Sequence, residues 1–412
     1  MASLALRGGT PLFPKELTVP WPQYDSSDEQ SLLSCYRSGI WWRGGTIQDQ
    51  EKSACGRFER AFAAFHDSPY GLAVSNGTIA LELALRAAGV GPGDEVLVPA
   101  LSFVVTASAA LTLGAYPVFV DVDPDTFQID PAHLESLIGP RTRAICLVHL
   151  AGYPADLDRI VPLAKKHKLA LVEDCAHSQG TQWRGKGVGS YGDFGTFSFQ
   201  QFKSLCCGEG GIVLAGTQES WSKLYRYHNL GRKENEGFHD FYEPSSNYRL
   251  TDLQGSLLES QFKKFEPQLR RRMESARVLS AGLAEVGGIS ALPADSRITR
   301  RGYYYFLMRY RKEAFKGVHR DKFIEALSAE GIPGVGKAYG KPIHKYPLFQ
   351  NLRVPSEHAN CRYASLSLPI VERIMGEELI SLHHPFLLAT KEALALFIAA
   401  VEKIKDHAEE LL

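Results

Sequence analysis

The sequence predicts an α/β fold in which a mainly parallel, seven-stranded sheet is flanked by helices and followed by a smaller C-terminal α+β domain. Two observations favour this class. Strand-like apolar runs recur at helix-sized intervals as far as residue 216, and the pattern changes after residue 248. The length of 412 residues is also long for one hydrophobic core. We therefore expect a large domain over residues 1–264, including the N-terminal segment, and a small domain over residues 265–412.

The strand-like runs and the patterns between them account for the large domain. Helical patterns at residues 78–89 and 157–168 fill two of the gaps, and such alternation predicts parallel strands covered by helices. The last two runs are too close for a helix between them, so at least one pair is expected to be antiparallel. The seven runs are residues 70–75, 95–100, 116–122, 143–150, 169–175, 194–199 and 210–216.

The second half of the chain has a different pattern. Residues 249–283 carry an apolar stripe at helical spacing, which predicts one or two long amphipathic helices. A strand-like run at residues 303–311 and a helical pattern at 321–331 follow, and residues 391–412 form a closing helix. This mixture predicts a compact α+β unit.

Charge and cysteine usage restrict the function. Lys and Arg number 46 and so do Asp and Glu, which leaves no basic excess for binding nucleic acid. The seven cysteines include no CxxC pair, a pattern typical of free thiols in a reducing compartment. The N-terminus does not resemble a signal peptide. We expect a cytoplasmic protein.

One stretch is long enough to cross a membrane. Residues 96–120 contain no charged side chain. Prolines, glycines and hydroxyl residues interrupt the stretch, however, and its period changes from helix-like to strand-like. We interpret it as strand, loop, helix and strand within the core, and we expect no membrane span.

Asp174 closes the predicted strand at residues 169–175. Ligands of open α/β sheets bind outside the carboxyl ends of the strands, so Asp174 is placed to face one. A buried carboxylate there favours a cationic partner, such as a protonated ring nitrogen. The alternative role is a cap on a helix or a loop amide.

A phosphate-type helix start follows the first predicted strand. Residues 75–78, Ser-Asn-Gly-Thr, lead directly into an apolar-periodic helix. The free N–H groups and the dipole of such a helix start favour a phosphate, although Ser, Asn and Thr also cap helices for structural reasons.

Lys203 lies in the stretch FSFQQFKSLCCGEGG, among aromatic and small residues. Apolar surroundings depress the pKa of a lysine, and the resulting amine is a nucleophile and a proton carrier. Ser198 could add a hydroxyl to a phosphate site. The alternative is a surface lysine whose stem covers apolar surface.

Together these segments resemble the DegT–StrS family of aminotransferases that depend on pyridoxal 5′-phosphate (PLP) and have the fold-type-I architecture. The resemblance covers nearly the whole chain. It includes the motifs SGIWWRGG, NGTIALELAL, GDEVLVPALSF, VEDCAHSQG, FSFQQFK, GEGG, SSNYRLTDLQGSLLESQ and HKYPLF.

The resemblance implies a role for each site residue. Lys203 would form the Schiff base with PLP and carry protons, and Asp174 would hold the pyridinium. The phosphate would be bound by Thr78, by the amides of Gly77 and Ile79, by Ser198 and by Asn247 of the neighbouring subunit in a homodimer with shared sites. The ring would be stacked by Phe103 and lined by His177 and Gln200, and the substrate would contact Arg43 and His344.

The resemblance also suggests the reaction. Gln200, where many relatives carry His, is typical of two branches. One is the cyclitol aminotransferases, which move an amino group from L-glutamine or L-glutamate to a cyclic ketone in aminosugar or aminocyclitol biosynthesis. The other is 3-amino-5-hydroxybenzoate synthase, which aminates a ring and eliminates water. Residues 342–349 favour the first branch, and residues 21–25 and 40–43 favour the second. A PLP-binding sensory protein without turnover is a third possibility.

Histidines could in principle bind a metal. His149, His383 and His384 lack zinc-type spacing to other ligands, and the chemistry of PLP requires no metal. We therefore predict no metal site.

Overall fold

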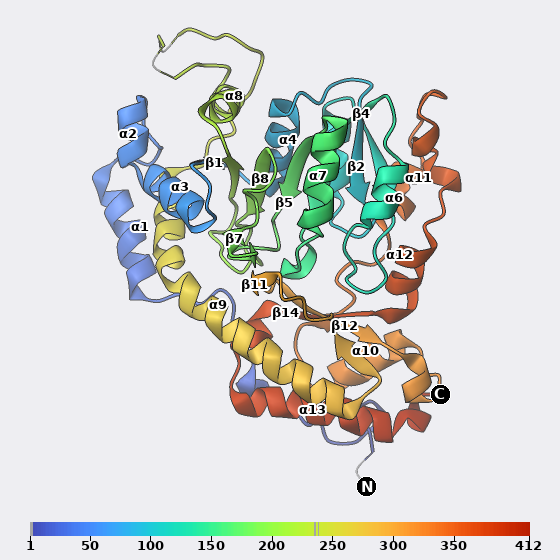
Figure 1. The fold of residues 1–412 in the computed structure, drawn as a ribbon. Coiled ribbons are helices and arrows are strands. Elements are labelled where there is room, and N and C mark those ends of the chain that lie inside the picture. Colours follow the sequence, from blue (N-terminus) through green and yellow to red (C-terminus); the bar gives the residue numbers. More distant parts are fainter. Residues whose placement is uncertain (1–2, 235, 238) are drawn as a thin grey trace.

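The computed structural model describes residues 3–234, 236–237 and 239–412, and a seven-stranded sheet forms its centre (Figure 1). All seven predicted strands are present. In spatial order they are β1 (Tyr70–Val74), β9 (Gly211–Ala215), β8 (Phe194–Ser198), β5 (Ala170–Asp174), β4 (Thr142–Val148), β2 (Glu95–Pro99) and β3 (Tyr116–Val120).

Only one strand of this sheet runs against the others. β9 pairs antiparallel with β1 and with β8, whereas β8, β5, β4, β2 and β3 pair in parallel. The antiparallel pairing of β8 with β9 confirms the prediction. The loop that joins these two strands is too short to contain a crossover helix. The carboxyl ends of six strands consequently lie at one edge of the sheet.

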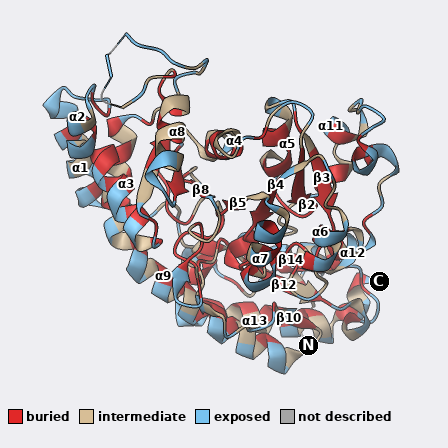
Figure 2. Cartoon of the chain, turned by 45° about the horizontal axis from the view of Figure 1, so that its top comes forward, coloured by how far each residue is buried: buried red, intermediate tan, exposed pale blue. Residues whose placement is uncertain are grey.

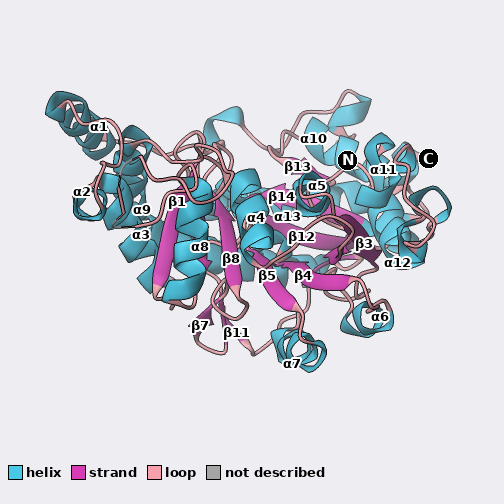
Figure 3. Cartoon of the chain, turned by 90° about the horizontal axis from the view of Figure 1, so that it is seen from above, coloured by secondary structure: helices cyan, strands magenta, loops and turns pink. Residues whose placement is uncertain are grey.

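Helices cover both faces of the sheet. Helices α6 and α7 lie on one face and α4 and α5 on the other (Figures 1 and 3). The strands between them are almost entirely buried (Figure 2). The helices of this half are α1 (Ser26–Ser38), α2 (Ile47–Lys52), α3 (Ala54–Phe65), α4 (Gly77–Ala87), α5 (Val105–Thr112), α6 (Pro131–Ser136), α7 (Leu157–His167) and α8 (Gln218–His228).

The uncharged stretch 96–120 forms β2, α5 and β3, as predicted. In the part of the chain that the structure describes, no helix has both the length and the apolar character needed to span a membrane. All seven cysteines are buried and carry free thiols.

A single helix, α9 (Asp252–Val286), joins the two halves of the molecule. The sequence left open one or two helices here. Its first turns pack on α1 and α3, and its last turns pack on β10 (Ile289–Ala291) and α13 (Lys391–Asp406). Leu258 belongs to the larger core and Leu279 to the smaller one. The predicted division at residue 264 therefore falls inside a continuous helix, because one apolar stripe serves both cores.

A four-stranded antiparallel sheet forms the smaller half. Its order is β10, β12 (Tyr305–Tyr310), β14 (Leu379–His383) and β13 (Val335–Gly336). This half also contains α10 (Arg320–Ala329). After it, the chain returns along the larger half and forms α11 (Pro347–Gln350) and α12 (Pro369–Arg373) there.

The N-terminal segment (residues 3–21) was predicted to belong to the large domain, but it packs on the smaller half. Leu4 and Phe13 are buried in the second core, beside residues from α10 and α13. Backbone N–H groups of Ala5 and Leu12 donate to the Glu330 carboxylate at 2.9 and 3.2 Å. Sequence pattern alone could not reveal this long-range contact, because the segment is short and has no periodicity.

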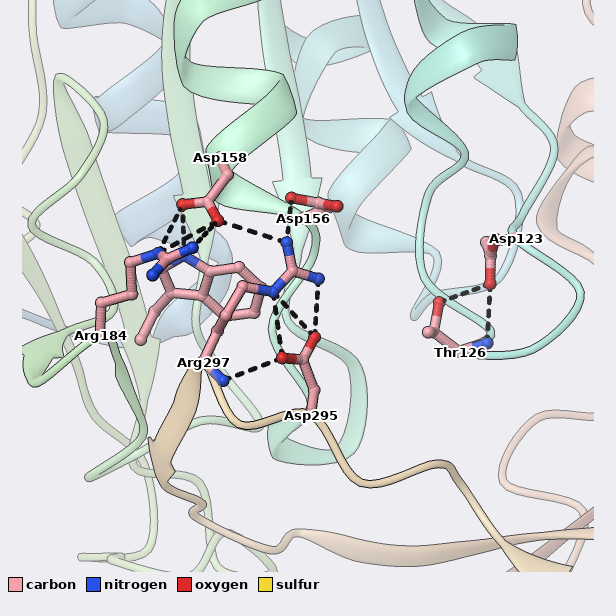
Figure 4. Close-up of polar contacts among 8 residues, drawn as sticks. Asp123, Thr126, Asp156, Asp158, Arg184, Asp295 and Arg297 are labelled. Atoms are coloured by element: carbon pink, nitrogen blue, oxygen red, sulfur yellow. Dashed lines mark hydrogen bonds and ion pairs between the residues drawn. The ribbon is translucent and has the colours of Figure 1, made fainter.

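A third, small sheet joins the halves a second time. Strand β11 (Ile298–Arg300) pairs with β6 (Gln182–Trp183) of the hairpin that β6 forms with β7 (Lys186–Gly187). Just before β11, Arg297 bonds Asp295 at 2.7 Å and Asp156 at 3.1 Å (Figure 4). Asp158 accepts from both Arg297 and Arg184, at 3.3 and 2.8 Å. These ion pairs fix the chain that leads into β12.

Candidate active site

A cavity of about 670 Å³ opens at the carboxyl ends of the parallel strands. This is the edge at which open α/β sheets bind their ligands. The residues at its wall come from segments far apart in sequence. They include Asn76, Ser102, Val148, Asp174, Ser198 and Lys203.

Asp174 ends β5 and is buried at the base of the cavity. One carboxylate oxygen accepts from the Thr106 hydroxyl at 2.8 Å, and the other accepts from the amide of Ala176 at 3.1 Å. Burial raises the pKa of Asp174, against these bonds and the nearby Lys203. Its hydrogen-bond donors are neutral, so a protonated ring nitrogen would supply the positive charge that a buried carboxylate favours.

The N-terminus of α4 faces Ser198 across a very short gap. A Cβ atom on Gly77 would lie 2.6 Å from the Cβ of Ser198, so only glycine permits this approach. Gly77, Thr78 and Ser198 all line the cavity, and the start of an eleven-residue helix favours an anion there. The predicted phosphate residues are thus brought together.

Ile79 is a correction to this set. Its amide donates to the side chain of Asn76 at 2.9 Å, which is the N-cap bond of α4. Ile79 is therefore removed from the candidate phosphate ligands, because its only N–H is already used.

Lys203 follows β8 and extends into the cavity from a turn in which its amide bonds the carbonyl of Gln200 at 2.7 Å. Its Nζ lies 4.4 Å from the ring centre of Tyr304. Burial lowers the pKa of Lys203 to about 8, and the Asp174 carboxylate opposes the shift. The uncharged share of this amine near neutral pH is therefore much larger than for an ordinary lysine, and the uncharged amine is the nucleophile.

The loop that carries Lys203 is held through its backbone carbonyls. The indole of Trp21 donates to Gln201 O and a ring nitrogen of His384 donates to Phe202 O, both at 2.9 Å. The hydroxyl of Ser204 bonds Gln179 at 2.8 Å. None of these supports could be predicted from the local pattern, since Trp21, Gln179 and His384 are all distant in sequence from the carbonyl or hydroxyl that they bond.

Aromatic rings surround the mouth of the cavity. His177 stacks on Tyr304 with 4.0 Å between the ring centres, and Phe103, which is 56% exposed, lies 6.3 Å from Tyr339. Gln200 also lines the cavity, and its side-chain oxygen accepts from the amide of Phe202. The predicted residues His177, Phe103 and Gln200 are therefore together at one site. Sequence reasoning missed Tyr304 and Tyr305, whose run YYYF indicated only a strand, and it also missed Tyr339.

Arg43 does not reach this cavity and is a second correction. Its guanidinium is buried and pairs with Glu59 at 2.8 Å. The Glu59 carboxylate accepts from the amide of Ala73, and Arg43 bonds the carbonyl of the same residue. The pair thus bonds the backbone N–H and C=O groups of Ala73 on the outer edge of β1, which has no further strand beside it in this sheet.

His344 does not line the cavity either. It is buried, and its Nε2 lies 3.1 Å from a carboxylate oxygen of Glu372. Asn247 is exposed outside the cavity of its own chain. An exposed position is compatible with the predicted role of Asn247 towards a neighbouring subunit.

His149, Glu173 and Cys175 form a buried group whose spacing could suit a metal ion. Their hydrogen bonds argue for a structural role. His149 Nδ1 accepts from the amide of Ala155, so its Nε2 carries the proton that it donates to Glu173 at 2.9 Å. Glu173 also accepts from three loop amides, and burial holds the pKa of Cys175 well above its usual value.

A desolvated amine beside a buried carboxylate is suited to the transfer of amino groups, and the fold with this cavity defines an α/β aminotransferase. The chain belongs to the DegT/DnrJ/EryC1/StrS aminotransferase family, whose model matches residues 23–385.

Individual relatives cover most or nearly all of the chain. An L-glutamine:2-deoxy-scyllo-inosose aminotransferase of Streptoalloteichus tenebrarius is 36% identical over 99% of this chain and 99% of its own. A 3-amino-5-hydroxybenzoate synthase of Amycolatopsis mediterranei is 35% identical over 90% and 92%. Among solved structures, a 3-amino-5-hydroxybenzoic acid synthase has a TM-score of 0.84 and 33% identity over 95% of this chain and 99% of its own.

Proposed function

We propose that the chain is a PLP-dependent aminotransferase that moves the amino group of L-glutamine to the ketone of a cyclitol. The observation that carries the proposal is the cavity itself, which joins Lys203, the buried Asp174 and the N-terminus of α4. These groups fit the amine-reactive carbon, the ring nitrogen and the phosphate of PLP. Bound there, PLP supplies an electron sink for the carbon that carries the migrating amine.

The residues of the chain have separate tasks in this proposal. Asp174 would keep a proton on the ring nitrogen, and Gly77, Thr78 and Ser198 would hold the phosphate. Phe103 would stack on the ring, and His177 and Gln200 would line it. Lys203 would take the proton from the carbon that bears the amine of the donor and deliver it to the carbon that receives the amine, which its lowered pKa favours.

The donor and the acceptor are inferred from relatives. Several relatives that match nearly the whole chain at 33–36% identity are named as L-glutamine aminotransferases of scyllo-inosose or its 2-deoxy form. We take L-glutamine and a cyclic polyhydroxylated ketone of this type as the substrates. L-Glutamate is the alternative donor, and a synthase of the 3-amino-5-hydroxybenzoate type is the second candidate function, favoured by a relative and a solved structure of that name.

We further propose a homodimer in which Asn247 completes the phosphate site of the partner. Its exposed position outside its own cavity supports this assignment. Cytoplasmic location is supported by the seven buried free thiols.

The test is the visible absorbance of the protein with PLP before and after L-glutamine. We expect a band of lysine-bound PLP that disappears with L-glutamine and returns when 2-deoxy-scyllo-inosose is added. In Lys203→Ala, borohydride reduction should leave the protein mass unchanged, whereas the wild type gains one reduced cofactor.

Other outcomes have distinct meanings. A band that ignores L-glutamine but responds to L-glutamate changes the donor. A band that resists both donors favours the inert PLP-binding alternative, and release of water with formation of an aromatic product favours the synthase. No band in the wild type would contradict the cofactor assignment.

A further inference from the structure

We propose that Tyr339 determines acceptor specificity by donating a hydrogen bond to an oxygen of the cyclic ketone, and that His177 positions its hydroxyl. The inference rests on the proposed function and assigns a new role within the same cavity. Tyr339 follows β13 in the smaller half, whereas Asp174 and Lys203 come from the larger half, and all three line the cavity.

The tautomer of His177 follows from its contacts. Its Nδ1 accepts from the backbone N–H of Ala151 at 3.4 Å. Because that nitrogen is an acceptor, the ring proton is on Nε2, which lies 3.3 Å from the hydroxyl oxygen of Tyr339. Burial keeps the pKa of His177 well below its usual value, with Lys203 and His383 adding to the shift, so the ring stays neutral.

Packing fixes the direction of this Nε2–H group. Tyr304 stacks on the imidazole at 4.0 Å and 22°, and Tyr305 meets it edge-on at 5.7 Å and 86°. The ring of Tyr339 is nearly parallel to it, at 11°. The imidazole can therefore donate in one direction only, towards Tyr339.

The hydroxyl of Tyr339 is left with its own proton to donate. It receives a hydrogen bond from His177, and burial raises its pKa well above the usual value, so the proton is retained. The amide of the preceding Ala338 bonds the hydroxyl of Ser381 in β14 at 2.8 Å, which anchors this segment. A neutral donor in a fixed direction suits a hydroxyl or carbonyl oxygen of a polyhydroxylated ring.

The first experiment separates the two half-reactions. With L-glutamine and then 2-deoxy-scyllo-inosose, Tyr339→Phe should raise the KM for the ketone by about three- to tenfold, the value of one lost hydrogen bond. The single-turnover rate constant with L-glutamine should fall by a smaller factor. Equal losses in both half-reactions, or no loss, would overturn the proposal. Tyr310→Phe is the matched control, because its hydroxyl bonds only Val318 O at 3.0 Å in the smaller core.

The positioning role of His177 needs its own variants. His177→Leu should raise the ketone KM as Tyr339→Phe does, and the double variant should be no worse than either. His177→Gln, which retains an N–H donor, should recover part of the loss. Additive losses in the double variant would overturn the coupling between the two residues.

A measurement independent of turnover completes the test. Nitrogen NMR of histidine-labelled protein should show His177 as the neutral Nε2–H tautomer, and its Nε2–H signal should shift in Tyr339→Phe. An Nδ1–H tautomer or a charged ring would contradict the assignment. If the wild type uses no ketone, both the proposed function and the specificity role of Tyr339 are wrong. The NMR result still decides whether His177 orients Tyr339.

Discussion

At the scale of single residues, the absence of one Cβ atom shapes the candidate phosphate site. Gly77 begins α4 directly against Ser198, and a methyl group would come within 2.6 Å of the serine Cβ. Real Cβ atoms do not approach so closely, so α4 or β8 would have to move. The atoms nearest to the added methyl group are Cβ, Oγ and Cα of Ser198. Because Cβ and Cα are fixed to the backbone of β8, a rotation of the serine side chain cannot relieve the contact.

We expect Gly77→Ala to weaken PLP binding by at least about fivefold, since overpacking of a tight contact costs about 1–3 kcal/mol. The same overpacking should lower the thermal stability of the apoprotein, and the higher helix propensity of alanine offsets part of that loss. Equilibrium titration with PLP measures the effect. Gly216→Ala is the control, because nothing lies within 4 Å of its Cβ position and it is exposed. Equal affinities for the two variants would contradict the close-packing argument.

Residues that carry their chemistry in a local motif could be predicted from the sequence. Asp174 and Ser198 each lie at the end of a strand-like run and Lys203 lies in the loop after the second of these runs, and the structure brings all three to one cavity. Arg43 and His344 were predicted only from their resemblance in position to family residues. In the structure they pair with Glu59 and Glu372 and do not line the cavity. Tyr339 and Trp21 could not be found, because their contacts join segments far apart in the chain.

At the scale of elements, the loop between β8 and β9 needs support from outside. It contains no regular structure after Ser198, and the carbonyls of Gln201 and Phe202 are bonded by Trp21 and His384. The rings of Trp21 and His384 meet at 4.5 Å and 89°, so the two supports also pack on each other. The N-terminal segment and the smaller half thereby position Lys203.

Trp21→Phe removes one indole N–H and leaves a carbonyl of this loop without its partner, at a cost of about 1–3 kcal/mol. We expect the rate constant of the L-glutamine half-reaction to fall about tenfold. Stopped-flow absorbance measures it. Trp221→Phe is the control, because it loses a similar bond to Gly71 O, at 3.3 Å, on β1 and away from the loop. The support argument is wrong if Trp221→Phe slows the reaction as much.

The elements themselves were predicted more fully than their connections. The seven strands follow from apolar runs, and the single antiparallel strand follows from loop length. Helix α9 extends through the predicted domain boundary because amphipathic spacing indicates which residues are buried, not which core buries them.

At the scale of the whole molecule, the two ends of the chain stabilise the smaller half together. Glu330 is buried and bonds Ala5 and Leu12 of the N-terminal segment and Lys403 of α13. It therefore joins the first residues, the end of α10 and the last long helix. The cavity depends on this half, which supplies Tyr304, Tyr305 and Tyr339.

Glu330→Ala should lower the free energy of unfolding by about 3 kcal/mol, because it removes the carboxylate shared by two backbone amides and by the half-buried Lys403, which keeps its bond to the carbonyl of Thr10. Denaturant unfolding followed by tryptophan fluorescence measures the loss. The control is Glu325→Ala on the same helix, whose side chain is exposed and whose removal should change little. A small effect at Glu330 would show that the N-terminal segment adds little to the stability of this half.

The rate at which each buried free thiol is labelled measures local opening of the structure around it. Cys206, three residues beyond Lys203, is buried and its burial raises the pKa of the thiol to about 11, so it should react slowly with a labelling reagent unless the loop opens. Cys35 lies on α1 and Cys361 near α11, so labelling sites found by mass spectrometry distinguish opening of the lysine loop from opening elsewhere. PLP should slow the labelling of Cys206 and leave that of Cys35 unchanged, so the occupancy of the cavity can be timed without following catalysis.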